Sequence, residues 1–128
     1  MRLLLDTHAL IWWLRGDARL GASARPAIED RRNEVIVSAV SAFEVTTKHR
    51  LGKLPEADVL ARDFDGERRK EGFLALDISV AHAARAGSLQ GAHRDPFDRL
   101  LIAQALVEGL TLVSNEALFD GFGVQRLW

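Results

Sequence analysis

The chain has 128 residues, of which 48% are hydrophobic and 27% are charged, which is typical of a folded domain and excludes a disordered tail or a fibre. Cysteine is absent, which excludes disulfides and thiolate metal sites and leaves oxygen and histidine as the ligands for any metal ion. The net charge of −1 excludes the broad basic surface of non-specific DNA-binding proteins, so a nucleic-acid ligand is expected to be gripped locally.

Short apolar runs alternate with helical patterns along the whole chain. The expected elements, in chain order, are a strand at 2–5, a helix at 7–14 that stops at Gly16, a helix that Ser23 caps, a strand at 35–37, a helix at about 41–51, a charged helix at about 57–71, a strand at 73–76, a helix from Ser79 to about residue 89, a helix from Asp95 to Glu108, a strand at 110–113 and a short strand at 124–127.

Strands of about four residues that alternate with helices predict a parallel sheet covered on both faces. We therefore expect the α/β class, as a three-layer α/β/α domain with a short-stranded, mostly parallel central sheet. The chain has three prolines and no repeats, so residues 1–128 are expected to form one domain, with a helical hairpin at about 41–71. The N-terminal segment lacks the apolar run of roughly 7 to 15 residues found in signal peptides, so a cytoplasmic protein without membrane association is expected.

Acidic residues recur where the expected strands end. Asp6 directly follows the first strand, and Glu116 follows the fourth. Asp95 and Asp98 begin the most apolar helix, and Glu44 lies among apolar neighbours in the third helix. Ligands of parallel sheets collect outside the carboxyl ends of the strands, so four separate segments are expected to deliver acids to one edge.

Each acid also has a purely structural interpretation. Asp6 and Asp95 can cap the helices that follow them. Ser41 and Glu44 match a capping box, and Glu44 can also pair with Lys48 one helical turn later. These interpretations stay open for single residues, whereas the convergence of the acids favours a shared site.

Crowded carboxylates raise one another's pKa unless a cation neutralises them. Oxygen ligands without cysteine favour Mg²⁺ or Mn²⁺ over Zn²⁺, and such ions hydrolyse phosphate esters by activating water. The pattern therefore predicts metal-dependent phosphoryl chemistry. Thr7 is expected to orient Asp6 or a metal-bound water, and His8 and His93 are candidate ligands. Arg99 is a candidate for phosphate contact or for an ion pair with a nearby acid.

Four segments of the chain resemble those of PIN-domain nucleases, and more narrowly those of the VapC-type toxins of bacterial toxin–antitoxin pairs. The segments are LLLDTH at 3–8, VSAVSAFE at 37–44 with LGKL at 51–54, HRDPFDRLLIAQA at 93–105 and TLVSNE at 111–116. The resemblance covers nearly the whole chain in order, and the segment from 93 to 105 is its most specific part.

The resemblance implies a Mg²⁺- or Mn²⁺-dependent endoribonuclease that acts as the toxin of a type II toxin–antitoxin pair and inhibits translation by cutting RNA, such as tRNA or rRNA. It also implies a small VapB-like antitoxin as partner and a homodimer. The positions of the family's metal-binding acids are occupied here by Asp6, Glu44, Asp98 and Asp95. Glu116 stands where the family usually has Asp, and Ser114 stands where Thr is frequent, so a metal role for Glu116 is the weakest expectation.

Two alternative functions remain. A haloacid-dehalogenase-like phosphatase also uses an Asp after the first strand, but it needs a second Asp two positions later, where this chain has His8, and it leaves Glu44 unused. A catalytically inactive binding module with the PIN fold is the other alternative, and the departure at Glu116 motivates it.

Overall fold

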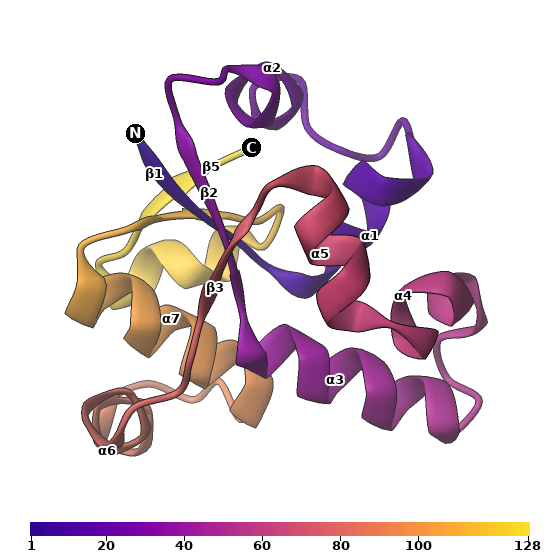
Figure 1. The fold of residues 1–128 in the computed structure, drawn as a ribbon. Helices are drawn as coiled ribbons and strands as arrows, with labels where there is room; N and C mark the ends of the chain where they lie inside the picture. The colour runs from indigo at the N-terminus through magenta and orange to yellow at the C-terminus, as the bar shows by residue number, and fades with distance from the viewer.

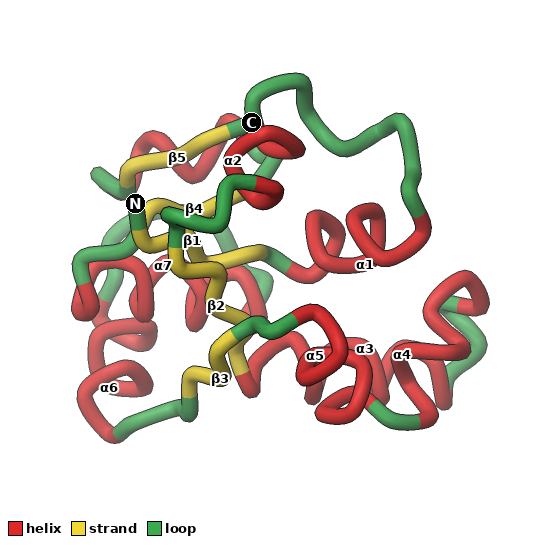
Figure 2. Tube along the Cα trace, turned by 45° about the horizontal axis from the view of Figure 1, so that its top comes forward, coloured by secondary structure: helices red, strands yellow, loops and turns green.

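A single sheet of five strands lies at the centre of the structure, a computed structural model that describes all residues from 1 to 128 (Figures 1 and 2). The strand order is β3-β2-β1-β4-β5, and every neighbouring pair is parallel, which confirms the expected parallel sheet. The strands are β1 (Arg2–Leu5), β2 (Glu34–Ser38), β3 (Leu74–Leu76), β4 (Thr111–Val113) and β5 (Gln125–Leu127).

Helices cover both faces of the sheet, which confirms the three-layer α/β class (Figure 1). The α-helices are α1 (Thr7–Arg15), α2 (Ala24–Glu29), α3 (Ala39–Arg50), α4 (Asp58–Arg62), α5 (Phe64–Glu71), α6 (Val80–Ser88) and α7 (Pro96–Glu108), and the 3-10 helices are η1 (Pro55–Ala57) and η2 (Ala117–Phe122). None of these helices is long and apolar enough to cross a membrane.

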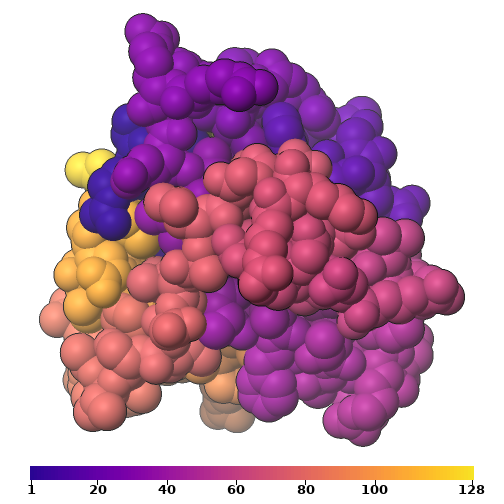
Figure 3. Space-filling model, viewed as in Figure 1, coloured from indigo at the N-terminus to yellow at the C-terminus, as the bar shows by residue number.

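The core consists of two apolar clusters, one on each face, because successive strand residues point to opposite sides of the sheet. Leu3 and Leu5 of β1 pack in the cluster that α1, α2 and α4 cover. Leu4, between them, packs in the cluster that α7 and η2 cover. The apolar run from Leu3 to Leu5 is therefore buried on both faces, as is typical of parallel sheets. In the space-filling view of Figure 3, α5 and α6 form much of the near surface.

Two sequence predictions of helix limits are wrong. The helix α3 begins at Ala39 and not near residue 41, because Ser38 at the end of β2 is its N-cap and accepts a hydrogen bond from the Val40 amide at 2.9 Å. The charged helix expected at about 57–71 is divided into α4 and α5, because the backbone of Asp63 is not helical and its side chain caps α5. The helical hairpin predicted at about 41–71 therefore consists of α3 followed by the shorter helices η1, α4 and α5.

Candidate active site

Asp6 lies at the switch point of the sheet, where β1 has β2 on one side and β4 on the other. Open α/β sheets form a ligand-binding crevice at this point, beyond the carboxyl ends of their strands. The backbone amide of Asp6 donates to the Val113 carbonyl at 3.0 Å, which fixes Asp6 against the end of β4. Its side chain is nearly buried, with 8% of the residue exposed.

The carboxylate of Asp6 caps α1, because its Oδ1 accepts a hydrogen bond from the Ala9 amide at 2.8 Å. Burial raises the pKa of Asp6 to about 6, although hydrogen bonds from Ser114 and Ala9 oppose the rise, and the charge of Asp98 adds to it. A carboxylate has about four acceptor positions on two oxygens, so capping leaves acceptor capacity for a cation.

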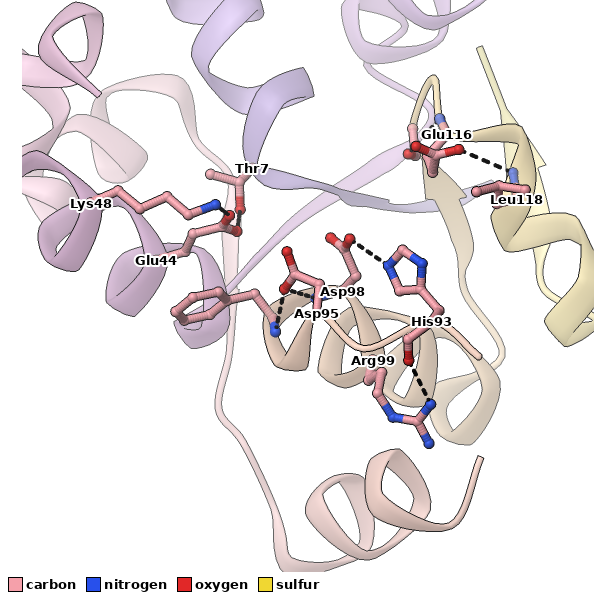
Figure 4. A network of polar contacts seen from close by, with 11 residues as sticks. Thr7, Glu44, Lys48, His93, Asp95, Asp98, Arg99, Glu116 and Leu118 are labelled. Atoms are coloured by element: carbon pink, nitrogen blue, oxygen red, sulfur yellow. Dashed lines mark hydrogen bonds and ion pairs between the residues drawn. The ribbon is translucent and has the colours of Figure 1, made fainter. Parts of the chain in front are cut away.

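Glu44 projects from the second turn of α3 and is 4% exposed (Figure 4). Its Oε1 accepts a hydrogen bond from the Thr7 hydroxyl at 2.7 Å, and its Oε2 pairs with the Lys48 ammonium one turn later. The predicted pair with Lys48 is therefore confirmed. The capping box is wrong, because Ser41 lies inside the helix, where its hydroxyl is 3.0 Å from that of Thr7.

The hydroxyl of Thr7 has a different partner from the one that the sequence predicts. The sequence predicts that Thr7 orients Asp6 or a metal-bound water, whereas the hydroxyl donates a hydrogen bond to Glu44. Lys48 is partly buried, and its ammonium lies 5.5 Å from the centre of the Phe97 ring. A buried carboxylate such as Glu44 needs partners of this kind, because an unpaired buried charge is costly.

Asp95 and Asp98 lie at the start of α7 (Figure 4). Asp95 is the N-cap, since its Oδ1 accepts hydrogen bonds from the amides of Phe97 at 2.8 Å and Asp98 at 3.2 Å. Oδ2 of Asp98 lies 2.8 Å from Nε2 of His93. Burial raises the pKa of Asp98, the His93 hydrogen bond lowers it, and the charges of Asp95 and Glu44 raise it further.

Ser114 and Glu116 follow the end of β4. Ser114 is fully buried, hydrogen-bonds to the Asp6 carboxylate and accepts a hydrogen bond from the Glu116 amide at 3.1 Å. Glu116 caps η2, because its Oε1 accepts from the Leu118 amide at 3.2 Å, and Figure 4 shows its side chain next to Leu118. Its position therefore has a structural explanation in addition to the predicted metal role.

A cavity of about 170 Å³ joins these segments, and we call it the acidic cavity. Its lining residues are Asp6, Thr7, His8, Glu44, Lys48, Asp95, Asp98, Asn115, Glu116 and Phe119. The structure thus brings together all five acids that the sequence singled out. Lys48 is the one lysine or arginine in the lining, so the carboxylates outnumber the cations five to one.

The donor set of the acidic cavity fits a hard divalent cation, because Mg²⁺ and Mn²⁺ prefer carboxylate oxygens. Burial and neighbouring charges raise the pKa values of Asp6 and Asp98, and a bound cation would offset the free energy of ionising them. No three His, Asp or Glu side chains are already gathered around one point as ligands. Glu44 and Asp98 have internal partners, so cation binding requires an exchange of some of these contacts.

Arg99 has a role that the sequence did not reveal. We expected phosphate contact or an ion pair, and its guanidinium instead donates to the carbonyls of Ala86 at 3.0 Å, Leu89 at 2.5 Å and His93 at 3.0 Å. Arg99 therefore fastens the loop between α6 and α7 to the start of α7. These carbonyls converge only when α6 packs on α7, so no local pattern signals the contact.

Comparisons with known proteins place the whole chain in a family. The sequence matches the family model of the PIN domain over residues 3–123. Ribonuclease VapC22 of Mycobacterium tuberculosis is 30% identical over 115 residues, which cover 89% of this chain and 86% of that protein. Ribonuclease VapC16 of the same organism is 37% identical over 70 residues, which cover 52% of this chain and 50% of that protein.

Solved structures share the fold at low sequence identity. A VapBC2 complex from Rickettsia felis, bound to a DNA fragment from its promoter, superimposes with a TM-score of 0.66 at 18% identity and covers 99% of this chain and 98% of that chain. VapC20 of Mycobacterium tuberculosis, a toxin that cleaves the sarcin-ricin loop, gives a TM-score of 0.67 at 17% identity over 95% of both chains. Because the family model spans nearly the whole sequence, this chain belongs to the PIN-domain family.

Proposed function

We propose that this protein is an endoribonuclease that hydrolyses RNA phosphodiester bonds with Mg²⁺ or Mn²⁺ held in the acidic cavity. The observation that carries the proposal is the meeting of five carboxylates around one cavity at the switch point of the sheet. Membership of the PIN-domain family, with relatives named as ribonucleases, supports RNA as the substrate.

Asp6, Glu44 and Asp98 are the proposed principal metal ligands, with Asp95 beside them and Glu116 as the least supported candidate. A bound divalent cation supplies positive charge that activates water and offsets the charge of the scissile phosphate. The chain's own contribution is to hold the carboxylates: Thr7 and Lys48 fix Glu44, and His93 orients Asp98. Ser114 hydrogen-bonds to Asp6 and holds it at the end of β1.

The decisive experiment incubates the protein with total cellular RNA and maps the cut ends. We expect cleavage with Mg²⁺ or Mn²⁺, no cleavage with a chelator, and a loss of several orders of magnitude in Asp98→Asn, because that change removes a ligand charge and keeps the side-chain shape. The matched control is Asp77→Asn, the same chemical change at an exposed residue outside the cavity. Full activity of the Asp98→Asn protein would contradict the site assignment.

A second variant tests the weakest ligand. Glu116 has a capping contact of its own, so Glu116→Gln, which can still accept from the Leu118 amide, should reduce cleavage less than Asp6→Asn does. The same RNA assay measures both variants under equal metal concentrations. An equal loss in the two proteins would mean that Glu116 is a principal ligand.

The two alternative functions give different results in the same assays. A haloacid-dehalogenase-like phosphatase forms a covalent aspartyl phosphate on Asp6 and hydrolyses small phosphate esters, whereas the proposed ribonuclease forms no covalent intermediate. An inactive binding module binds RNA or a partner and leaves RNA intact with either metal. Mass spectrometry of the protein after incubation with substrate, together with RNA mapping, separates the three.

We also propose that the protein is the toxin of a type II toxin–antitoxin pair in the cytoplasm, partnered by a VapB-like antitoxin and able to form a homodimer. Solved structures with this fold include toxin–antitoxin complexes from Rickettsia felis and Klebsiella pneumoniae, which supports such a partner. Induced expression should stop growth and protein synthesis, and the Asp98→Asn protein should not. Growth arrest by both proteins would exclude RNA cleavage as the cause of toxicity, and analytical ultracentrifugation measures the oligomeric state.

A further inference from the structure

A second cavity, of about 400 Å³, lies between the loop that joins α6 to α7 and the 3-10 helix η2, and we call it the loop cavity. Its lining includes Gln90, Gly91, Ala92, His93, Leu118 and Phe122. No Asp, Glu, Lys or Arg lines it, in contrast to the acidic cavity. Its volume lies within the range of about 300–1,000 Å³ that is usual for small-ligand sites. The lining suits a flat, uncharged group rather than a phosphate.

The wall of the loop cavity is held in place before any ligand arrives. Arg99 hydrogen-bonds to the carbonyls of Leu89 and His93, at the two ends of the loop. Gly91 has φ +124°, a conformation that favours glycine, and a Cβ there would lie 3.2 Å from two atoms of the Phe122 ring. The loop therefore packs closely on Phe122, and a ligand would bind without first ordering it.

The loop also offers free polar groups at the rim. Residues 90–92 are exposed, lie outside any helix or strand, and make no backbone hydrogen bond to the rest of the chain. The side chain of Gln90 has no hydrogen-bond partner either. Exposed amides and carbonyls of this kind are free to exchange water for the polar edge of a ligand.

His93 connects the loop cavity with the acidic cavity. The rings of His93 and Phe122 are 6.4 Å apart and nearly perpendicular, so a flat group can stack on one and contact the edge of the other. His93 is hydrogen-bonded to Asp98 at 2.8 Å, and its ring packs edge-on against Phe119, which lines the acidic cavity. His93 therefore lines the loop cavity and contacts two residues that line the acidic cavity.

We propose that the loop cavity receives the unpaired base of a nucleotide next to the scissile phosphate, which makes it a subsite for nucleotide preference in the RNA. The proposal rests on the ribonuclease function proposed above. The net charge of −1 and the single lysine of the acidic cavity leave little Coulombic attraction for the RNA backbone. Stacking of a base on an aromatic ring supplies affinity that does not depend on charge.

The test compares intact RNA with RNA that lacks one base. Cut sites of the wild-type protein are first mapped on unstructured RNA, and synthetic RNAs then carry an abasic ribose at each position beside the cut bond. At one position we expect the abasic ribose to lower kcat/KM by about 10- to 100-fold, mainly through KM. The Phe122→Leu protein should cleave intact RNA with a kcat/KM that is lower by a comparable factor, and the abasic ribose should not lower it further.

Two further proteins keep the test independent of folding and of catalysis. Leu118→Ala changes a residue of the cavity wall that is 69% exposed, so it leaves the core intact. In this variant the abasic ribose should lower kcat/KM by a smaller factor than in the wild-type protein. In an Asp6→Asn background, which we expect to bind RNA without cleaving it, fluorescence anisotropy should show the same dependence of Kd on the abasic position. The matched control is Phe64→Leu, which changes a partly buried phenylalanine on the opposite face of the sheet and should keep the full abasic effect.

The outcomes separate this inference from the proposed function. Equal abasic losses in the wild-type, Phe122→Leu and Leu118→Ala proteins at every position, with RNA still cleaved, overturn the base subsite alone. Intact RNA after incubation of the wild-type protein with either metal overturns the ribonuclease proposal and the subsite with it. An abasic loss confined to proteins with the native cavity supports both.

Discussion

Replacement of Asp6 by asparagine should stabilise the metal-free protein while it abolishes RNA cleavage. Asn keeps the shape of the side chain and its amide oxygen can accept the hydrogen bond from Ala9 that caps α1. The change removes a buried negative charge that lies near Asp98 and has no basic residue among its hydrogen-bond partners. A group that binds a metal well is expected to destabilise the fold when the metal is absent.

The magnitude follows from the pKa of Asp6, which burial raises from 3.8 to about 6. A shift of about 2 pKa units corresponds to about 3 kcal/mol, and this is the upper limit of the effect. Because folding raises the pKa of Asp6, the folded state favours the protonated carboxyl group. The contribution of Asp6 to the stability of the wild-type protein is therefore complete below about pH 4 and is lost as the pH rises through about 6. The stability difference between variant and wild-type protein should therefore grow across this window and stay constant above it.

Urea unfolding in the presence of a chelator, at pH values from 4 to 8, measures this difference. At pH 7.5 we expect Asp6→Asn to be more stable by about 1–3 kcal/mol, or about 4 °C in Tm per kcal/mol for a chain of this length. The exposed control Asp77→Asn should change stability by less than about 0.5 kcal/mol. A stability difference that does not depend on pH, or an Asp6→Asn protein that is less stable at pH 7.5, would refute the reasoning.

Three other substitutions test the contacts around the site. Thr7→Val removes the hydroxyl that donates to Glu44, so urea unfolding should show a loss of about 1–2 kcal/mol, and an unchanged stability would contradict the contact. Lys48→Met leaves Glu44 without its cationic partner, so the free energy of unfolding at pH 7 should fall by about 1–3 kcal/mol. Mn²⁺ should then raise the Tm of this variant more than that of the wild-type protein. Equal Tm shifts with Mn²⁺ would argue against metal binding at Glu44. Arg99→Lys cannot reach three carbonyls, so limited proteolysis within residues 89–93 should become faster, and cleavage at the wild-type rate would show that Arg99 does not hold the loop.

The positions of the strands and of most helices were predictable because their signals are local. Apolar runs of three or four residues mark the buried strands, and Ser79 and Asp95 cap the helices that follow them, as expected. The start of α3 was not predictable by the same rule, since Ser38 and Ser41 both fit the N-cap position. Ser38 is selected because the ladder between β2 and β3 ends there and the helix follows at once.

The sequence by itself determined which acids follow strands or begin helices, and therefore which carboxylates reach the acidic cavity. For Asp6 and Glu116 that result follows from strand direction, because the carboxyl ends of parallel strands share one edge, whereas Glu44, Asp95 and Asp98 come from helices. The metal-binding roles of these acids stay predictions until the variants are measured. The tertiary structure alone decided their partners: Thr7 contacts Glu44 across 37 positions of the chain, and Arg99 reaches carbonyls that α6 and its loop provide. Such contacts depend on how elements distant in sequence pack together, and no local pattern encodes that packing.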